Sequence, residues 1–124
     1  MSTLQTSARW AYATPFLHGG LDTLKEPEHR IALAAGLGVP KPEIAARVNA
    51  AAMVLGGLAI ATGKHDRLGA SVLAISLVPT TLAAHSFWKA PPEMRKREFL
   101  NFAKNVGLLG GALMIAAGAN DKES

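Results

Sequence analysis

The chain has 124 residues, of which 49% are hydrophobic and 18% are charged, and its formal net charge is +4. This length suits one domain, and the lack of cysteine excludes disulfides, thiol nucleophiles and iron–sulfur ligation. The basic charge does not indicate nucleic-acid binding, because no single basic face can be drawn. Ala, Gly and Leu dominate over β-branched residues, which favours helices packed closely through small side chains.

Four apolar stretches predict membrane-spanning helices. In chain order they cover residues of about 10–24, 44–62, 68–88 and 99–119. A hydrocarbon core of about 30 Å needs roughly 20 helical residues, so the last three stretches fit well. The first is the weakest, because it is short and contains His18 and Asp22. From Leu68 to Trp88 there is no formal charge, so a soluble protein would have no hydrated face there. The sequence therefore predicts an all-α integral membrane four-helix bundle, with residues 1–124 as a single transmembrane domain, rather than a soluble Ala-rich bundle.

The connection between the first two helices is the longest, from Lys25 to Glu43. It contains an apolar piece, Ile31 to Pro40, which is too short to span a membrane and is interrupted by Gly and Pro. We expect a short interfacial or re-entrant segment here. Lys and Arg are more numerous on the face with the first and third connections, which places those connections in the cytoplasm and both termini outside. The chain is thus expected to be a multi-pass protein of the plasma membrane.

Several segments resemble the DoxX family of small four-helix membrane proteins. RWAYATPFLHGGLDTLKEP is similar to the family's first helix, and RVNAAAMVLGGLAIATGKHDRLGA is similar to its second. The most specific likeness is the His-x-x-Trp of His85 and Trp88, followed by a Lys-Asn-x-x-x-x-Gly-Gly pattern from Lys104 to Gly111. The resemblance covers almost the entire chain and is nearest to actinobacterial members.

This resemblance implies a membrane protein connected with redox chemistry, since the family is named after a small subunit of a membrane quinone oxidoreductase. One position departs from the family pattern. Many members have a Glu in the second helix, about one turn before the glycine pair, where this chain has Met53. The departure argues against a proton or quinone function at that position.

Polar residues within the predicted spans are the candidates for a site, because such residues are costly in lipid. Topology places the polar ends of all four helices in one leaflet. Thr81, His85 and Trp88 are separated by four and three residues, so we expect them to share one helix face. The tentative cofactor-binding cluster, for which a quinone is the candidate ligand, comprises His18, Asn49, His85, Trp88, Lys104 and Asn105.

Structural roles compete with this interpretation. Asn49, Thr80 and Thr81 are of the type that forms hydrogen bonds between helices, and His85 could be another such donor. Trp88 would serve as an aromatic anchor at the membrane interface. The glycine pairs at 56–57 and 110–111 are expected at close helix contacts. No catalytic constellation or metal site is predicted.

Three functions are compatible with these patterns. The leading hypothesis is an accessory or scaffold subunit of a larger membrane redox or respiratory assembly, surrounded by the lipid bilayer. The first alternative is a quinone- or lipid-binding redox protein that uses the cluster around His85, and the second is a small-solute permease. No nucleic-acid partner is expected.

Membrane integration is directly testable. Because the stretch from Leu68 to Trp88 is free of charge, alkaline carbonate should leave the protein in the membrane pellet. Immunoblotting of pellet and supernatant after extraction of native membranes measures this. Release into the supernatant, as for a peripheral protein, would contradict the membrane assignment.

Overall fold

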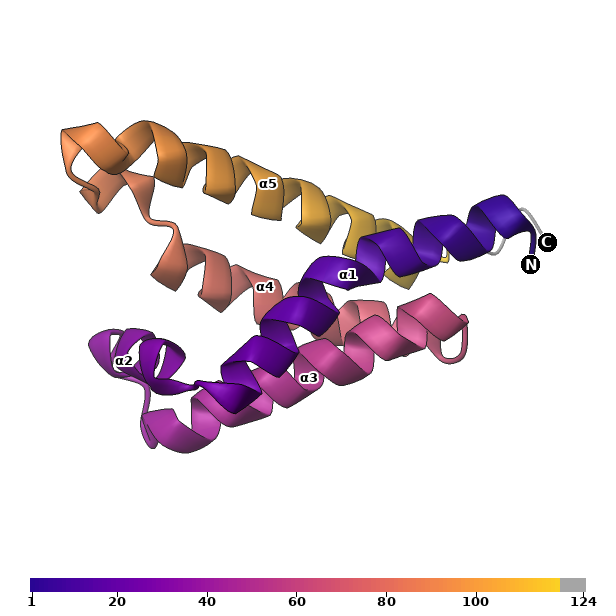
Figure 1. Ribbon diagram of the computed structural model, residues 1–124, viewed down its shortest axis with the longest axis horizontal. Coiled ribbons are helices and arrows are strands. Elements are labelled where there is room, and N and C mark those ends of the chain that lie inside the picture. Colours follow the sequence, from indigo (N-terminus) through magenta and orange to yellow (C-terminus); the bar gives the residue numbers. More distant parts are fainter. Residues whose placement is uncertain (119–124) are drawn as a thin grey trace.

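A computed structural model describes residues 1–118, which form five α-helices, one 3-10 turn and no strand. The elements are α1 (Thr3–Lys25), α2 (Glu28–Gly36), α3 (Pro42–Thr62), α4 (Asp66–Ala84), η1 (Phe87–Lys89) and α5 (Pro92–Ala116). The four long helices run alternately in opposite directions, so the start of α1 and the end of α5 lie at the same end (Figure 1). The predicted all-α membrane bundle is confirmed.

Three helical segments within residues 1–118 are long and apolar enough to cross a membrane. They are Pro42–Thr62, Asp66–Lys89 and Pro92–Ala116. α1 has 23 residues and so is long enough, but it is not among the sufficiently apolar helices. Its crossing of the membrane remains a prediction, favoured by its packing along α3.

α1 begins about two turns earlier than the hydropathy pattern predicts. Ser2 caps it: its hydroxyl accepts a hydrogen bond from the Gln5 backbone N–H at 3.0 Å, and Gln5 Oε1 accepts one from the Ser2 N–H at 2.8 Å. This reciprocal capping box satisfies two of the donors left free at a helix start. A polar first segment can therefore be helical without being apolar.

The core lies where α1, α3 and α4 meet. Phe16, Ile60 and Leu73 are its largest fully buried side chains. Glycines allow this contact, because a methyl group added at Gly56 would lie 2.9 Å from the Gly69 carbonyl oxygen. α3 and α4 therefore touch almost backbone to backbone, as small residues permit in membrane bundles.

A tight turn and an ion pair fix one end of this core. The turn from α3 to α4 contains Gly63 and His65, whose φ angles of 76° and 56° are left-handed. Arg9 of α1 pairs with Asp66 at 3.0 Å and also donates to the Ile60 carbonyl oxygen at 3.0 Å. A single guanidinium thus links α1 to the end of α3 and the start of α4.

The later helix boundaries also differ from the expected ones. α4 ends at Ala84 rather than near residue 88, and α5 begins at Pro92 rather than near residue 99. Pro92 suits the first turn of a helix, where its missing N–H has no intrahelical partner to lose. The charged residues that follow are good helix formers, so the basic segment at 93–98 is helix and not loop. Hydropathy cannot detect such a polar extension.

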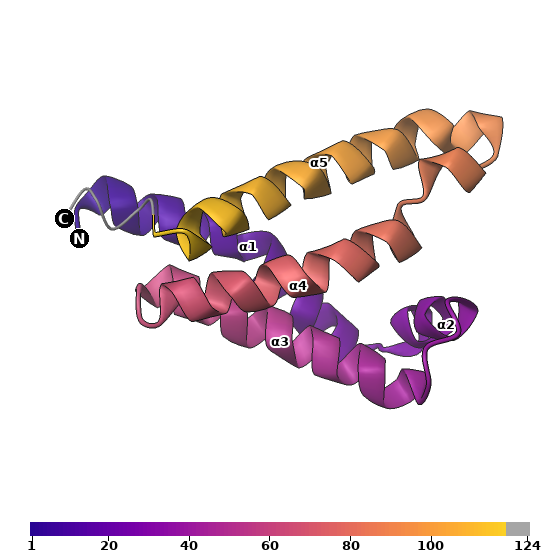
Figure 2. The ribbon, with the colours of Figure 1, turned by 180° about the vertical axis from the view of Figure 1, so that it is seen from behind.

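The predicted interfacial or re-entrant segment contains a helix of nine residues, α2, which packs mainly on α3 (Figure 2). None of its residues is fully buried. It ends just before Gly38, whose φ of 77° turns the chain toward α3. α2 therefore lies against the end of the bundle where α3 begins.

α5 packs mainly on α4 and has one fully buried residue, Ala112. The hydroxyl of Tyr12 donates to the Leu108 carbonyl oxygen, and the Tyr12 ring lies against Gly111. Gly110 is exposed, and a methyl group added there would have no neighbour within 4 Å. The expectation that Gly110 makes a packing contact is wrong within this chain, because successive helix residues differ by about 100° in direction.

The two glycine environments predict opposite mutational effects. Gly56→Ala should lower the free energy of unfolding by about 1–3 kcal/mol, because the added methyl group overpacks the contact between α3 and α4. Gly110→Ala should leave it unchanged or raise it slightly, because the site is open. Thermal unfolding in mild detergent measures both. Equal melting temperatures for the two variants would contradict the assignment of the close contact to Gly56.

Candidate functional site

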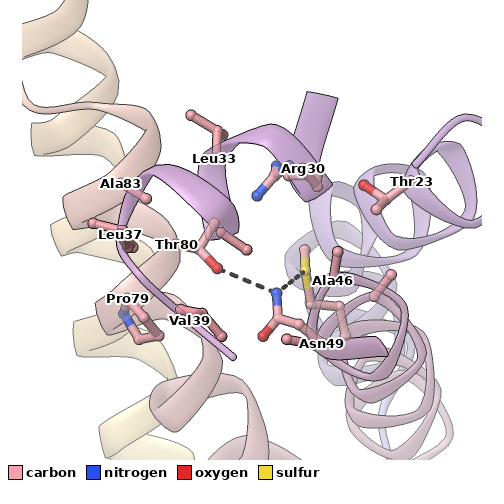
Figure 3. Close-up of a pocket in the computed structure, with 14 residues that line it drawn as sticks. Thr23, Arg30, Leu33, Leu37, Val39, Ala46, Asn49, Pro79, Thr80 and Ala83 are labelled. Atoms are coloured by element: carbon pink, nitrogen blue, oxygen red, sulfur yellow. Dashed lines mark hydrogen bonds between the residues drawn. The ribbon is translucent and has the colours of Figure 1, made fainter. Parts of the chain in front are cut away.

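A pocket of about 220 Å³ lies among the first four helices, at the end of the bundle covered by α2 (Figure 3). Its walls are mostly apolar, with four polar side chains among them. The polar side chains are Thr23, Arg30, Asn49 and Thr80. The apolar walls include Leu33, Leu37, Val39, Ala46, Met53 and Pro79.

Asn49 is the centre of the hydrogen bonding in this pocket. Its side-chain amide donates to the Thr80 hydroxyl at 3.2 Å and contacts the Met53 sulfur at 3.8 Å (Figure 3). The bond to Thr80 joins α3 to α4 where the two helices have separated. Asn49 was predicted both as a candidate ligand contact and as an interhelical donor, and the structure places it where either role is open to it.

Arg30 is the charged residue of the pocket lining. It is partly buried, and it makes no hydrogen bond or ion pair with another residue of 1–118. Burial lowers the pKa of its guanidinium, and the charge of Asp22 acts in the opposite direction. A group with so high an ordinary pKa stays charged at neutral pH. The pocket thus combines an apolar wall with one cation that lacks an acceptor among the described residues.

A second interhelical bond lies on the other side of α4. The Asn105 amide donates to the hydroxyl of buried Thr81 at 3.0 Å. Thr80 and Thr81 are consecutive, so they point in directions about 100° apart. α4 therefore makes one hydrogen bond toward α3 and the next toward α5.

His85 forms the third link between helices. Its Nδ1 lies 3.1 Å from Glu98 Oε2 on α5, and both side chains are largely shielded. The predicted cluster grouped His85 with Lys104 and Asn105 of this helix, but its hydrogen-bonding partner is Glu98, which lies outside that cluster. The reason is the early start of α5, which brings Glu98 into the helix opposite the end of α4.

The expectation that Thr81, His85 and Trp88 share one helix face is wrong. His85 is the C-cap residue of α4, and Trp88 follows on the separate turn η1. Trp88 is half exposed and meets the Phe87 and Phe102 rings edge to face. Its aromatic neighbours and exposure are those of an interface anchor.

The six candidate residues therefore do not form one site. Asn49 lines the pocket, whereas His85 and Asn105 are used in links between α4 and α5. His18 and Lys104 are exposed and do not line it. Arg30 is one of the basic residues of the connection from Lys25 to Glu43, which were used only to predict orientation, and its place in the pocket was not predicted. The available signal was its position directly before Ile31–Pro40, a piece too apolar for an ordinary loop.

Another pocket, of about 370 Å³, lies at the opposite end between α1 and α5. Arg9 and Tyr12 are among its lining residues. Arg9 is already paired with Asp66, and the Tyr12 hydroxyl already donates to the Leu108 carbonyl oxygen. Over residues 1–118, no group of three or more His, Asp or Glu is placed to hold a metal ion.

The link between α4 and α5 gives a measurable coupling. In a double-mutant cycle with Thr81→Val and Asn105→Leu, the interaction free energy should be about 0.6 kcal/mol and no more than about 1.7 kcal/mol, the range for such bonds in lipid. Chemical or thermal unfolding of the four proteins in detergent provides the values. Strict additivity of the two changes would show that this contact does not stabilise the fold.

Comparison with known proteins agrees with the architecture. The DoxX family model matches residues 4–86, which is more than half of the chain and covers α1 to α4. No curated protein and no solved structure gives a match. Because the family match stops before α5, the likeness of that helix to the family's last helix remains a prediction. The chain belongs to the DoxX family.

Proposed function

We propose that this chain is an accessory or scaffold subunit of a larger membrane redox or respiratory assembly. The observation that carries the proposal is the outer face of α5, a helix able to span the membrane with one fully buried residue. The redox character of the assembly is supported by the family resemblance. In this proposal the protein resides in the plasma membrane as a single four-span domain, and α1 crosses the bilayer alongside α3.

The outer face of α5 has a regular pattern. Its members are all exposed and are spaced by three or four residues along the helix, so they form one continuous stripe. They are Ala103, Val106, Gly107, Gly110, Leu113 and Met114. At both Gly107 and Gly110, an added methyl group would have no neighbour within 4 Å. The stripe is thus a shallow track of small residues bordered by larger apolar side chains.

Such a track suits a second helix better than it suits lipid chains. Lipid is as apolar as a leucine side chain, so apolarity alone does not bring helices together in a membrane. Close packing does, and small residues permit it because they let two backbones approach. Gly110 lies on the side of α5 opposite Ala112, so a helix docked there would not disturb the existing contact with α4.

The rival function, quinone or lipid binding centred on His85, receives less support from the geometry. His85 already has Glu98 as its partner at 3.1 Å and does not line the pocket among α1 to α4. Ligand binding is instead favoured at the pocket that contains Asn49 and Arg30. Such binding is compatible with the accessory role, because the pocket and the stripe involve different helices.

The docking role predicts an effect specific to the α5 stripe. Gly110→Leu should abolish co-purification of a stoichiometric partner from native membranes in mild detergent, because the side chain fills the track. Its melting temperature should stay within a degree or two of the wild type. Gly36→Leu is the matched control, since Gly36 is equally open but lies on α2. An intact complex with Gly110→Leu, or equal loss with Gly36→Leu, would contradict docking through this face.

A further inference from the structure

The pocket among α1 to α4 has a chemistry that subunit docking does not use. We propose that it binds an anionic phospholipid, with the phosphate at Arg30 and part of an acyl chain between α3 and α4. This inference is independent of the docking role of α5, because no residue of α5 lines the pocket.

The cation gives the first argument. Arg30 is the charged group among the lining residues, and no carboxylate lines the pocket with it. It has no hydrogen-bond acceptor within residues 1–118, although Asp22 is close enough to act on it electrostatically. Placing a guanidinium without an acceptor beside apolar walls is unfavourable. A phosphate would correct this, because the planar guanidinium can donate two parallel hydrogen bonds to it.

The neighbouring polar groups give the second argument. The Thr80 hydroxyl accepts the hydrogen bond of Asn49, which leaves its own proton available to donate. A hydroxyl donor beyond the phosphate site is suited to the ester carbonyl of a glycerolipid, which has acceptors and no donors at that position.

The order of polarity along the pocket gives the third argument. α2 with Arg30 covers the end of the bundle where α3 begins, Asn49 and Thr80 follow, and Met53 lies one turn further along α3. In a spanning bundle this order runs from the membrane surface toward its interior, as it does from the headgroup to the chain of a phospholipid. A volume of about 220 Å³ is below the roughly 300–1,000 Å³ of pockets that enclose a whole small molecule. It therefore suits part of a lipid whose remainder stays in the bilayer.

Native mass spectrometry of the full chain released from mild detergent tests the proposal. The probes are phosphatidylglycerol and phosphatidylcholine with identical acyl chains, and inorganic phosphate alone. The wild type should retain one phosphatidylglycerol in preference to phosphatidylcholine. Arg30→Gln should weaken that binding by at least roughly tenfold, the effect of losing a hydrogen bond to a charged group. Inorganic phosphate should neither bind at comparable concentration nor displace the lipid.

Matched variants separate the pocket from general surface charge. Arg47→Gln removes an equal charge from an exposed residue of α3 that does not line the pocket, and it should bind phosphatidylglycerol as the wild type does. Arg30→Lys should retain part of the preference. Met53→Trp, which fills the inner pocket, should weaken both lipids while Arg30 remains. Equal loss with Arg47→Gln, unchanged binding in Arg30→Gln, or equally tight binding of inorganic phosphate would each overturn the proposal.

Discussion

The backbone contact between α3 and α4 at Gly56 and Gly69 determines how the rest of the bundle is arranged. At this point the Gly69 carbonyl oxygen occupies the space that a side chain on Gly56 would need. The short turn through Gly63 and His65 holds the two helices together at the same end. The helices then separate toward the other end of the bundle (Figure 1). The pocket lies in the space that opens there, and α2 covers it.

Polar groups are used where this separation leaves too little apolar contact. Asn49 bridges to Thr80 across the open end, and Asn105 reaches Thr81 from the other side of α4. Within a membrane these groups have little water to bond with, so pairing them with each other avoids the cost of leaving polar groups unsatisfied in an apolar environment. The adjacent hydroxyls of Thr80 and Thr81 therefore bond α4 to α3 on one side and to α5 on the other. Its position relative to both neighbours is therefore specified and not left to apolar packing alone.

How much could be predicted from the sequence depends on the kind of signal. The charge-free stretch at 68–88 and the small-residue composition were enough to predict the helical membrane architecture, because hydrophobic length is a constraint set by the bilayer. The capped first turns of α1 and the charged first turns of α5 were not predicted, because hydropathy gives no signal for helical segments made of polar residues. Asn105 was predicted only as a candidate ligand contact, whereas Asn49, Thr80 and Thr81 were recognised as interhelical hydrogen-bonding residues from residue type alone. The pairing of His85 with Glu98 could not be, because it depends on where α5 begins.

Arg30 illustrates why the pocket itself was not predicted. The residues that line the pocket come from four helices. They are brought together by the way α3 and α4 cross, so no regular spacing in the sequence marks them. Arg30 enters the pocket because α2 folds back onto α3 instead of extending as a loop.

α5 is attached to the rest of the bundle by few contacts. Tyr12 bonds to it near one end, polar links hold it toward the other, and one of its residues is fully buried. A helix held in this way completes the fold with one face and leaves the opposite face available. The pocket and the stripe on α5 therefore respond to separate mutations, and neither proposal depends on the other.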